Sequence, residues 1–410
     1  MAGSPSALRE LRYRSSSALK TSFQNAAAAY WNTDNAEKLE ITAYDASGLV
    51  QEGLEDITLQ TRKHSKGSPT VGLAKGSLKF STYLQGADSG IDIGPGSQLL
   101  NVLMGNLQAT ASARTATVGA NSTTTNINIT GVNGYVVAGQ AALCGVRNDG
   151  KGMGEVKPIN AVGTDWIGLS IATNAALASG DTVAFSDTAY FDEDQAQEYL
   201  EVTSIGHATA DQRQAHGAGI FTLTMGQGER PSIDVDVAVA DHRHVPTLER
   251  SSFTSGTNPS GNDPAFSGAI GLIHIGDHGD STRTQRMGGD ITFDPGLVLQ
   301  EKMDPAGPSG VGEYVKMPSV PSLELSLYYD EDMDGLASDY NSATAKTALI
   351  QMGHVQGKCV AIELPKCYLD NLPDDGDLNG LMAVKVTLHG DEDFIDGSDI
   401  RSAAGRIHML

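Results

Sequence analysis

Two clusters of histidine and aspartate come nearest to a metal site in this chain. The string DHRH contains His242 and His244, and the string HIGDHGD contains His274 and His278. Imidazole and carboxylate groups bind zinc, and bound zinc activates water for hydrolysis. Neither string has the HExxH spacing that puts two histidines on one face of a helix. We interpret both as polar residues of a glycine-rich stretch, and a metal-dependent hydrolase that uses the loop at 274–280 stays an alternative.

A calcium loop is the second chemistry that the sequence suggests. The string DEDMDG, which begins at Asp330, has carboxylates at loop positions 1, 3 and 5 and glycine at position 6, as an EF-hand loop does. The residue at position 12 is Asn341 instead of the bidentate glutamate, and a strand pattern ending at Tyr329 replaces the incoming helix. The sequence therefore favours a solvated acidic turn.

Other catalytic signatures are missing from the sequence. The three cysteines, Cys144, Cys359 and Cys367, form no CxxC pair, which argues against a disulfide framework and a thiolate zinc site. We expect them to be buried as small hydrophobic residues. The sequence also has no GxSxG motif and no P-loop motif. We therefore predict that the chain is not an enzyme and has no cofactor or metal centre.

The charge and composition limit the classes of partner. The 410 residues carry a net charge of −22, which argues against gripping nucleic acid phosphates because that needs clusters of lysine and arginine. A surface past which DNA slides remains compatible with this charge. The hydrophobic content of 40% supports a packed core, and 47 glycines predict many turns and short strands. The sequence contains no apolar run long enough for a transmembrane helix and begins without the apolar segment of a signal peptide.

The elements that organise the chain begin at residues 71–108. Alternating polarity predicts a strand whose one face carries Leu78, Phe80, Thr82 and Leu84. A glycine-rich loop at 85–96 leads to a short amphipathic helix from Ser97 to Met104. A strand, a long loop and a helix lying across the sheet are typical of an α+β arrangement.

Further strands are predicted at 37–59 (two strands and a turn), 198–205, 219–226, 232–240, 321–329, 357–369 and 381–390. The clearest alternation is SIDVDVAVA at 232–240, where Asp234 and Asp236 face away from the valines. We also predict helices at 6–29 and 338–353, a long loop at 241–319 with two strand-like pieces, and an extended arm over the last twenty residues.

A change of composition divides the chain into a parent domain and an insertion. From residue 109 to 190 the sequence is rich in Thr, Ser, Ala, Gly and Asn, and short alternating stretches recur. This pattern predicts a small β-barrel or sandwich inserted into the parent domain formed by 1–108 and 191–410.

Four stretches of the chain together form a recognisable pattern: KGSPTVGLAKGSLKFSTYLQG with GPGSQLLNVLMG, HGAGIFTLTMGQGERPSIDVDV, GKCVAIELPKCYL and DGDLNGLMAVKVTLHGDEDF. In these stretches the chain resembles the major tail tube protein of long-tailed, siphovirus-like bacteriophages. The resemblance implies a mainly β (α+β) fold, namely a β-sandwich or partly closed barrel of two packed sheets with a flanking helix. It also implies hexameric rings that stack into a tube, with DNA passing through the lumen without specific binding.

The implied partners are copies of the chain itself, a tape-measure protein, and tail terminator and distal tail proteins. The implied location is the virion, assembled in the host cytoplasm. In this interpretation the inserted β domain lies on the outer surface of the tube. The basic stretch TRKHSKGS supplies candidates for the contact between rings: Arg62, Lys63, His64 and Lys66.

The same interpretation predicts an acidic lumen. A sheet with one apolar face needs water on the other face, and an unpaired carboxylate is costly to bury. We therefore expect the polar, lumen-facing side of the ring to carry Glu201, Asp234, Asp236, Glu324 and Glu363. A decoration or adhesin protein that binds carbohydrate through the inserted β domain is the alternative function.

Overall fold

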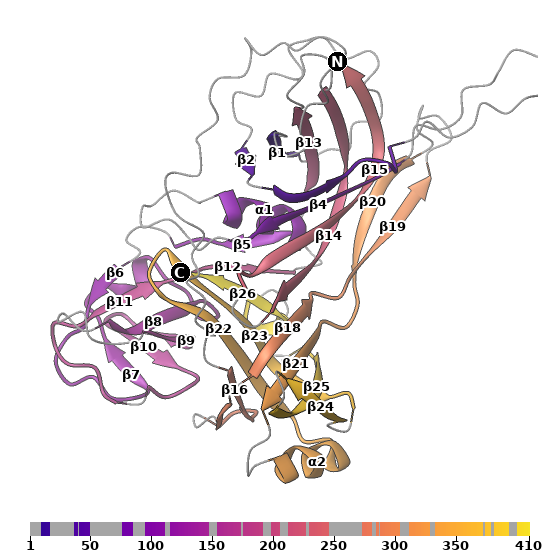
Figure 1. Cartoon of the computed structure of the whole chain (residues 1–410). Helices are drawn as coiled ribbons and strands as arrows, with labels where there is room; N and C mark the ends of the chain where they lie inside the picture. Colours follow the sequence, from indigo (N-terminus) through magenta and orange to yellow (C-terminus); the bar gives the residue numbers. More distant parts are fainter. Residues whose placement is uncertain are drawn as a thin grey trace, which may run out of the picture.

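The computed structural model describes residues 10–16, 37–39, 41–49, 76–84, 95–110, 115–146, 154–173, 175–191, 198–205, 212–226, 229–245, 273–280, 284–286, 288–303, 311–328, 333–371, 374–378, 381–392 and 400–410. Within these residues the fold is mainly β, as the sequence predicts, with antiparallel sheets and two α-helices (Figure 1). The helices are α1 (Pro95–Met104) and α2 (Met333–Ser342). Neither helix is long and apolar enough to cross a membrane.

The largest sheet has 18 strands. Its first strands are β1 (Glu10–Ser16), β2 (Glu37–Leu39), β3 (Ile41–Asp45), β4 (Gly76–Tyr83), β5 (Asn106–Gln108), β12 (Asp187–Tyr190), β13 (Tyr199–Ile205), β14 (Gln212–Met225) and β15 (Ser232–Val245). The others are β16 (Ile273–Asp277), β17 (Thr284–Arg286), β18 (Gly288–Asp294), β21 (Ser322–Tyr328), β22 (Lys346–Val355), β23 (Lys358–Leu369), β24 (Asp374–Leu378), β25 (Leu381–Gly390) and β26 (Arg406–Met409).

Strand β14 connects two parts of this sheet. It pairs with β15 along most of its length, and on its other edge it pairs first with β13 and then, at residues 223–225, with β18. Strands β15, β4 and β3 continue the sheet in one direction, whereas β18, β21, β25 and β23 continue it in the other (Figure 1). One hydrophobic core, to which both parts contribute, lies beneath them.

The apolar residues of the alternating stretch 232–240 pack in this core. Val235 and Val237 are buried, whereas Asp234 is exposed and Asp236 is half-exposed. The predicted faces of this strand are therefore confirmed. The predicted amphipathic helix is also confirmed, because α1 buries its leucines and Met104 against β12, β5 and β14.

A separate six-stranded sheet lies within residues 109–190. Its strands are β6 (Thr115–Thr117), β7 (Asn126–Asn128), β8 (Ala141–Val146), β9 (Glu155–Val162), β10 (Trp166–Leu169) and β11 (Thr182–Phe185). It has its own hydrophobic cluster, which includes Ile127, Ile167 and Phe185. Strands β5 and β12, which flank this sheet in the sequence, pair with each other in the large sheet. The chain therefore leaves the large sheet and returns to it at one place.

A two-stranded hairpin, β19 (Leu297–Met303) and β20 (Val311–Pro318), runs alongside β14 and β15 (Figure 1). Val311 and Tyr314 pack on small residues of the large sheet. Lys316 is buried and donates hydrogen bonds to the carbonyl oxygens of Val102 and Leu103 at the end of α1, at 3.2 Å for Leu103. Because a helix ends with unpaired carbonyl groups, Lys316 both caps α1 and fixes the hairpin to the core.

Three predictions of local structure are wrong. Residues 10–16, placed in a helix at 6–29, form strand β1, because Leu11 and Tyr13 alternate with polar residues and are buried. The helix predicted at 338–353 is displaced: α2 ends at Ser342, Ala343 has φ +49°, and the apolar run that follows forms β22. The carboxyl-terminal arm is instead the buried strand β26, between β12 and β23. The long loop predicted at 241–319 does contain the two strand-like pieces expected there, as β16 and as β18 with β19, and it contains β17 and β20 in addition.

Candidate functional site

The large sheet has a continuous polar face on the side opposite the core. Cross-strand neighbours follow one another from Thr224 on β14 to Thr292 on β18, then to Glu324 on β21 and Thr387 on β25. On the other side of β14, Thr222 lies opposite Asp234 of β15. All of these side chains are at least partly exposed.

The carboxylates of this face are paired with cross-strand partners. Asp236 forms an ion pair with Lys79, with 2.7 Å between Oδ2 and Nζ. Glu324 forms one with Lys385, with 3.0 Å between Oε2 and Nζ. Asp234 accepts a hydrogen bond from the hydroxyl group of Ser81. The hydrogen bond with Asp236 raises the pKa of Lys79. Two of the three predicted carboxylates that lie on this face are therefore neutralised by lysine.

Two of the five predicted lumen carboxylates do not lie on a water-exposed face. Glu201 is 4% exposed and pairs with Arg14 of the adjacent strand β1. Glu363 is 3% exposed and lies between Arg406 and His408. A carboxylate must face water only when it has no partner inside the protein. A buried carboxylate with a cation or hydrogen-bond donors beside it satisfies the same rule.

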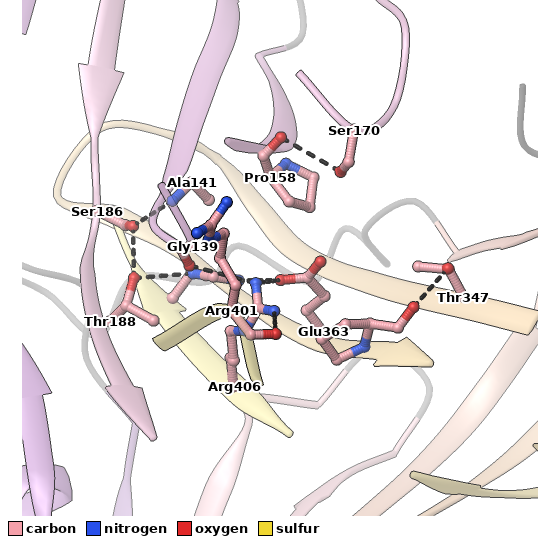
Figure 2. Close-up of polar contacts among 12 residues, drawn as sticks. Gly139, Ala141, Pro158, Ser170, Ser186, Thr188, Thr347, Glu363, Arg401 and Arg406 are labelled. Atoms are coloured by element: carbon pink, nitrogen blue, oxygen red, sulfur yellow. Dashed lines mark hydrogen bonds and ion pairs between the residues drawn. The ribbon is translucent and has the colours of Figure 1, made fainter. Parts of the chain in front are cut away.

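Glu363 belongs to a buried polar network at the junction of β23, β26 and β12 (Figure 2). Its Oε2 atom lies 3.0 Å from Arg406 Nη1 and 3.0 Å from His408 Nε2. On the other side of the ring, His408 Nδ1 lies 2.9 Å from Thr188 Oγ1, which lies 2.9 Å from Ser186 Oγ. The register places Glu363 opposite Arg406 and Thr188 opposite His408, so strand pairing creates the network.

The direction of each hydrogen bond follows from the two ends of this network. The Glu363 carboxylate accepts, so Nε2 of His408 carries the proton and Nδ1 accepts from the Thr188 hydroxyl. At the far end, Ser186 Oγ accepts from the backbone N–H of Ala141 at 2.8 Å. Because Thr188 donates its single hydroxyl proton to His408, the Ser186 hydroxyl donates to Thr188. With a neutral His408, every group between Ala141 and Glu363 has a partner.

The order Glu–His–Thr–Ser resembles a catalytic relay, but its environment is unlike that of an active site. Ser186, Thr188 and His408 all have 0% exposure, and the Ser186 hydroxyl is engaged by Ala141. Burial lowers the pKa of His408 below its usual value, and the interaction with Glu363 opposes this shift. A nucleophile needs access to substrate. We therefore assign this network a role in joining the strands.

The network continues into the contact with the six-stranded sheet. Arg406 donates to the Gly139 carbonyl at 3.5 Å (Figure 2). From β22, the side-chain amide of Gln351 accepts from Val156 N–H and donates to the Gly154 carbonyl, both at 2.7 Å. These bonds surround an apolar cluster that contains Ala141, Leu143, Val156, Ile171, Ala184, Leu349, Cys359, Ala361 and Leu410. The small sheet is thus fixed to the large sheet by apolar contacts and hydrogen bonds.

The histidine clusters do not form a metal site in the part of the chain that the structure describes, where no group of three or more His, Cys, Asp or Glu side chains could hold a metal ion. His274 is buried on β16, whereas His278 is exposed and its Nδ1 lies 3.0 Å from the Pro365 carbonyl oxygen. His242 and His244 lie at the end of β15.

Some of the remaining predicted residues lie outside the residues that the structure describes. Arg62, Lys63, His64 and Lys66, and the start of the calcium-like loop at 330–332, lie outside the described residues. All three cysteines are buried and free, as predicted. Burial raises the pKa of the Cys144 thiol to about 12.

Sequence reasoning missed the polar junction, although a signal was present. In RIHM at 406–409, charged or polar residues alternate with apolar ones, and Glu363 interrupts an apolar run in VAIEL. The charges on two such strands neutralise each other only when the strands pair. These two strands are distant in sequence, so no local pattern indicates that they pair. Comparison of the chain with protein-family models and with curated proteins found no match.

Proposed function

We propose that this chain is a structural subunit that assembles with copies of itself into the tail tube of a long-tailed bacteriophage. Rings of the subunit, six to a ring by the family resemblance, stack around a lumen through which DNA passes. Its other partners in this role are a tape-measure protein and the terminator and distal tail proteins, and its location is the virion.

The observation that carries the proposal is the apolar surface of the β19–β20 hairpin and the turn that follows it. Val298 is 49% exposed, Met303 68%, Met317 40% and Val320 56%. Val298 and Met317 lie opposite each other across the hairpin. Exposed apolar side chains at one end of the hairpin, where Val298 and Met317 are cross-strand neighbours, favour a protein contact, because their burial in an interface removes apolar area from water.

The open polar face supports the proposal that the rings enclose a lumen. It extends across several strands, and its hydroxyl groups and paired carboxylates remain hydrated. A ring of subunits can turn such a face toward a water-filled channel while adjacent sheet edges pair. Paired charges also leave few free cations to hold DNA phosphates.

Electron microscopy of the purified full-length chain tests the proposal, and the chain offers a matched pair of variants. Val298→Glu places a charge on the hairpin, and Val355→Glu places one at an equally exposed valine, 49% in both cases, on the β22–β23 turn. We expect rings or tubes for the unaltered protein and for Val355→Glu, and single subunits for Val298→Glu.

The circular dichroism spectra of both variants should match that of the unaltered protein, because neither valine is buried in the subunit. Discrete monomers of the unaltered protein under all assembly conditions would contradict the proposed function. If Val298→Glu forms tubes as well as the unaltered protein does, the hairpin is not part of the interface between subunits.

A further inference from the structure

The outer face of the small sheet carries an exposed aromatic platform around Trp166. Ile167, the next residue on β10, points into the core of the small sheet, so Trp166 points outward and is 39% exposed. The indole ring lies close over the backbone. A Cβ atom added to Gly163 would be 2.1 Å from the indole Nε1, and one added to Gly168 would be 3.2 Å from Cζ3. The ring therefore lies flat across β10 and its turn, which leaves its other face open to solvent.

Three asparagines surround this ring. Asn128 and Asn126 of β7 lie opposite Trp166 and Gly168, respectively. Asn160 of β9 places its Oδ1 2.8 Å from the position of a Cβ on Gly168, which locates it beside the ring. Asn128 uses its amide to donate to the Ala120 carbonyl at 2.8 Å. The side-chain amides of Asn126 and Asn160 form no hydrogen bond with another described residue and are exposed.

The chemistry of this platform selects a class of ligand. A flat aromatic face packs against the C–H groups on one face of a pyranose ring, and neutral amides both donate to and accept from sugar hydroxyl groups. The ring and the three asparagines carry no charge, which disfavours phosphate, nucleic acid and acidic sugars. The two glycines matter because a side chain at Gly163 would overlap the ring, and one at Gly168 would press on the Asn160 amide and on the edge of the ring.

We propose that Trp166, Asn126 and Asn160 form a binding site for neutral saccharides on the small β domain. The site is independent of the assembly proposed above, since none of its residues belongs to the hairpin or to the polar face of the large sheet. Such a site would let an assembled particle hold an uncharged surface glycan through many weak, repeated contacts.

Tryptophan emission provides a direct test, because the chain has two tryptophans and Trp31→Phe leaves Trp166 as the single reporter. The full-length Trp31→Phe protein is titrated with maltohexaose, cellohexaose, N-acetylchitohexaose and dextran, with hyaluronan as the acidic comparison. We expect a saturable change of Trp166 emission with at least one neutral glycan and none with hyaluronan. Calorimetry of the unaltered chain should give the same affinity.

Variants separate binding from a purely structural role of the ring. Asn160→Ala should weaken binding about tenfold and leave the unfolding curve unchanged, and Trp166→Ala should abolish binding measured by calorimetry. Val137→Ser is the matched control, since Val137 is 41% exposed on the same domain and should not affect binding. The proposal fails if no neutral glycan alters the emission, or if Asn160→Ala binds as tightly as the unaltered chain.

Discussion

Thr188 offers the sharpest test of the polar junction, because its hydroxyl group is the middle link between Ser186 and His408. Thr188→Val keeps the shape of the side chain and removes that hydroxyl. His408 Nδ1 then has no donor and the Ser186 hydroxyl has no acceptor, and both groups are fully buried. A buried polar group that loses its partner costs about 1–3 kcal/mol. We expect the variant to lose about 2–4 kcal/mol of unfolding free energy.

Urea unfolding at pH 7.5, followed by circular dichroism, measures this loss. Thr117→Val is the matched control: Thr117 is an exposed strand residue whose side chain makes no hydrogen bond in the described chain. A surface substitution of this kind changes stability by about 0.5 kcal/mol or less. Equal effects of the two substitutions would refute the directional hydrogen-bond network.

The same network predicts a pH dependence. The pKa of His408 is lowered in the folded state, so the unfolded chain binds more protons between the folded pKa and the unfolded value of 6.5. The His408 contribution is therefore fully present above pH 6.5 and is lost as the pH falls toward the folded pKa. One histidine can change the free energy of unfolding by at most about 1.4 kcal/mol per pH unit. His408→Leu should make the slope below pH 6.5 shallower, and an unchanged slope would show that His408 does not take part.

Two further predictions concern the hairpin and the polar face. Lys316→Met removes the cap of α1 and should cost about 1–3 kcal/mol, whereas Lys302→Met, at a surface pair with Glu313, should cost about 0.5 kcal/mol or less in urea unfolding. Because burial lowers the pKa of Lys316 to about 8, the unaltered chain should gain stability relative to Lys316→Met between pH 8 and 10.5, where the unfolded state binds more protons. Replacement of both Asp234 and Asp236 by lysine should still allow tubes to assemble but should slow DNA ejection from assembled particles; ejection at the unaltered rate would exclude this face from the channel.

Local patterns were sufficient to predict much of the fold. The strands around Leu78 and Val235 and the helix that ends at Met104 were predictable because each has one apolar face at a strand or helix period. Residues 10–16 and 346–355 were not, because the short alternation around Leu11 and the apolar run before Met352 fit more than one period. In both cases strand partners distant in sequence determine the structure.

The position of a carboxylate depends on its partner in the same way. Asp234 and Glu363 both occur in apolar strand sequences, so polarity alone assigned both to water. The registers separate them: Asp234 lies opposite Ser81 and Thr222 on an open face, and Glu363 lies opposite Arg406 inside the molecule. The registers that pair Asp234 with Ser81 and Glu363 with Arg406 join residues more than forty positions apart, and no local pattern contains them.

The pairing on the open face also changes the physical account of the proposed channel. A strongly acidic wall would repel DNA, but Lys79 and Lys385 neutralise Asp236 and Glu324 at contact distance. Screening at physiological salt limits any remaining field to about 8 Å. Adhesion of DNA depends instead on cations that are free to meet phosphates, and lysines already engaged by carboxylates must give up those contacts first. Free passage through such a channel therefore follows from hydrated hydroxyl groups and engaged lysines more than from repulsion.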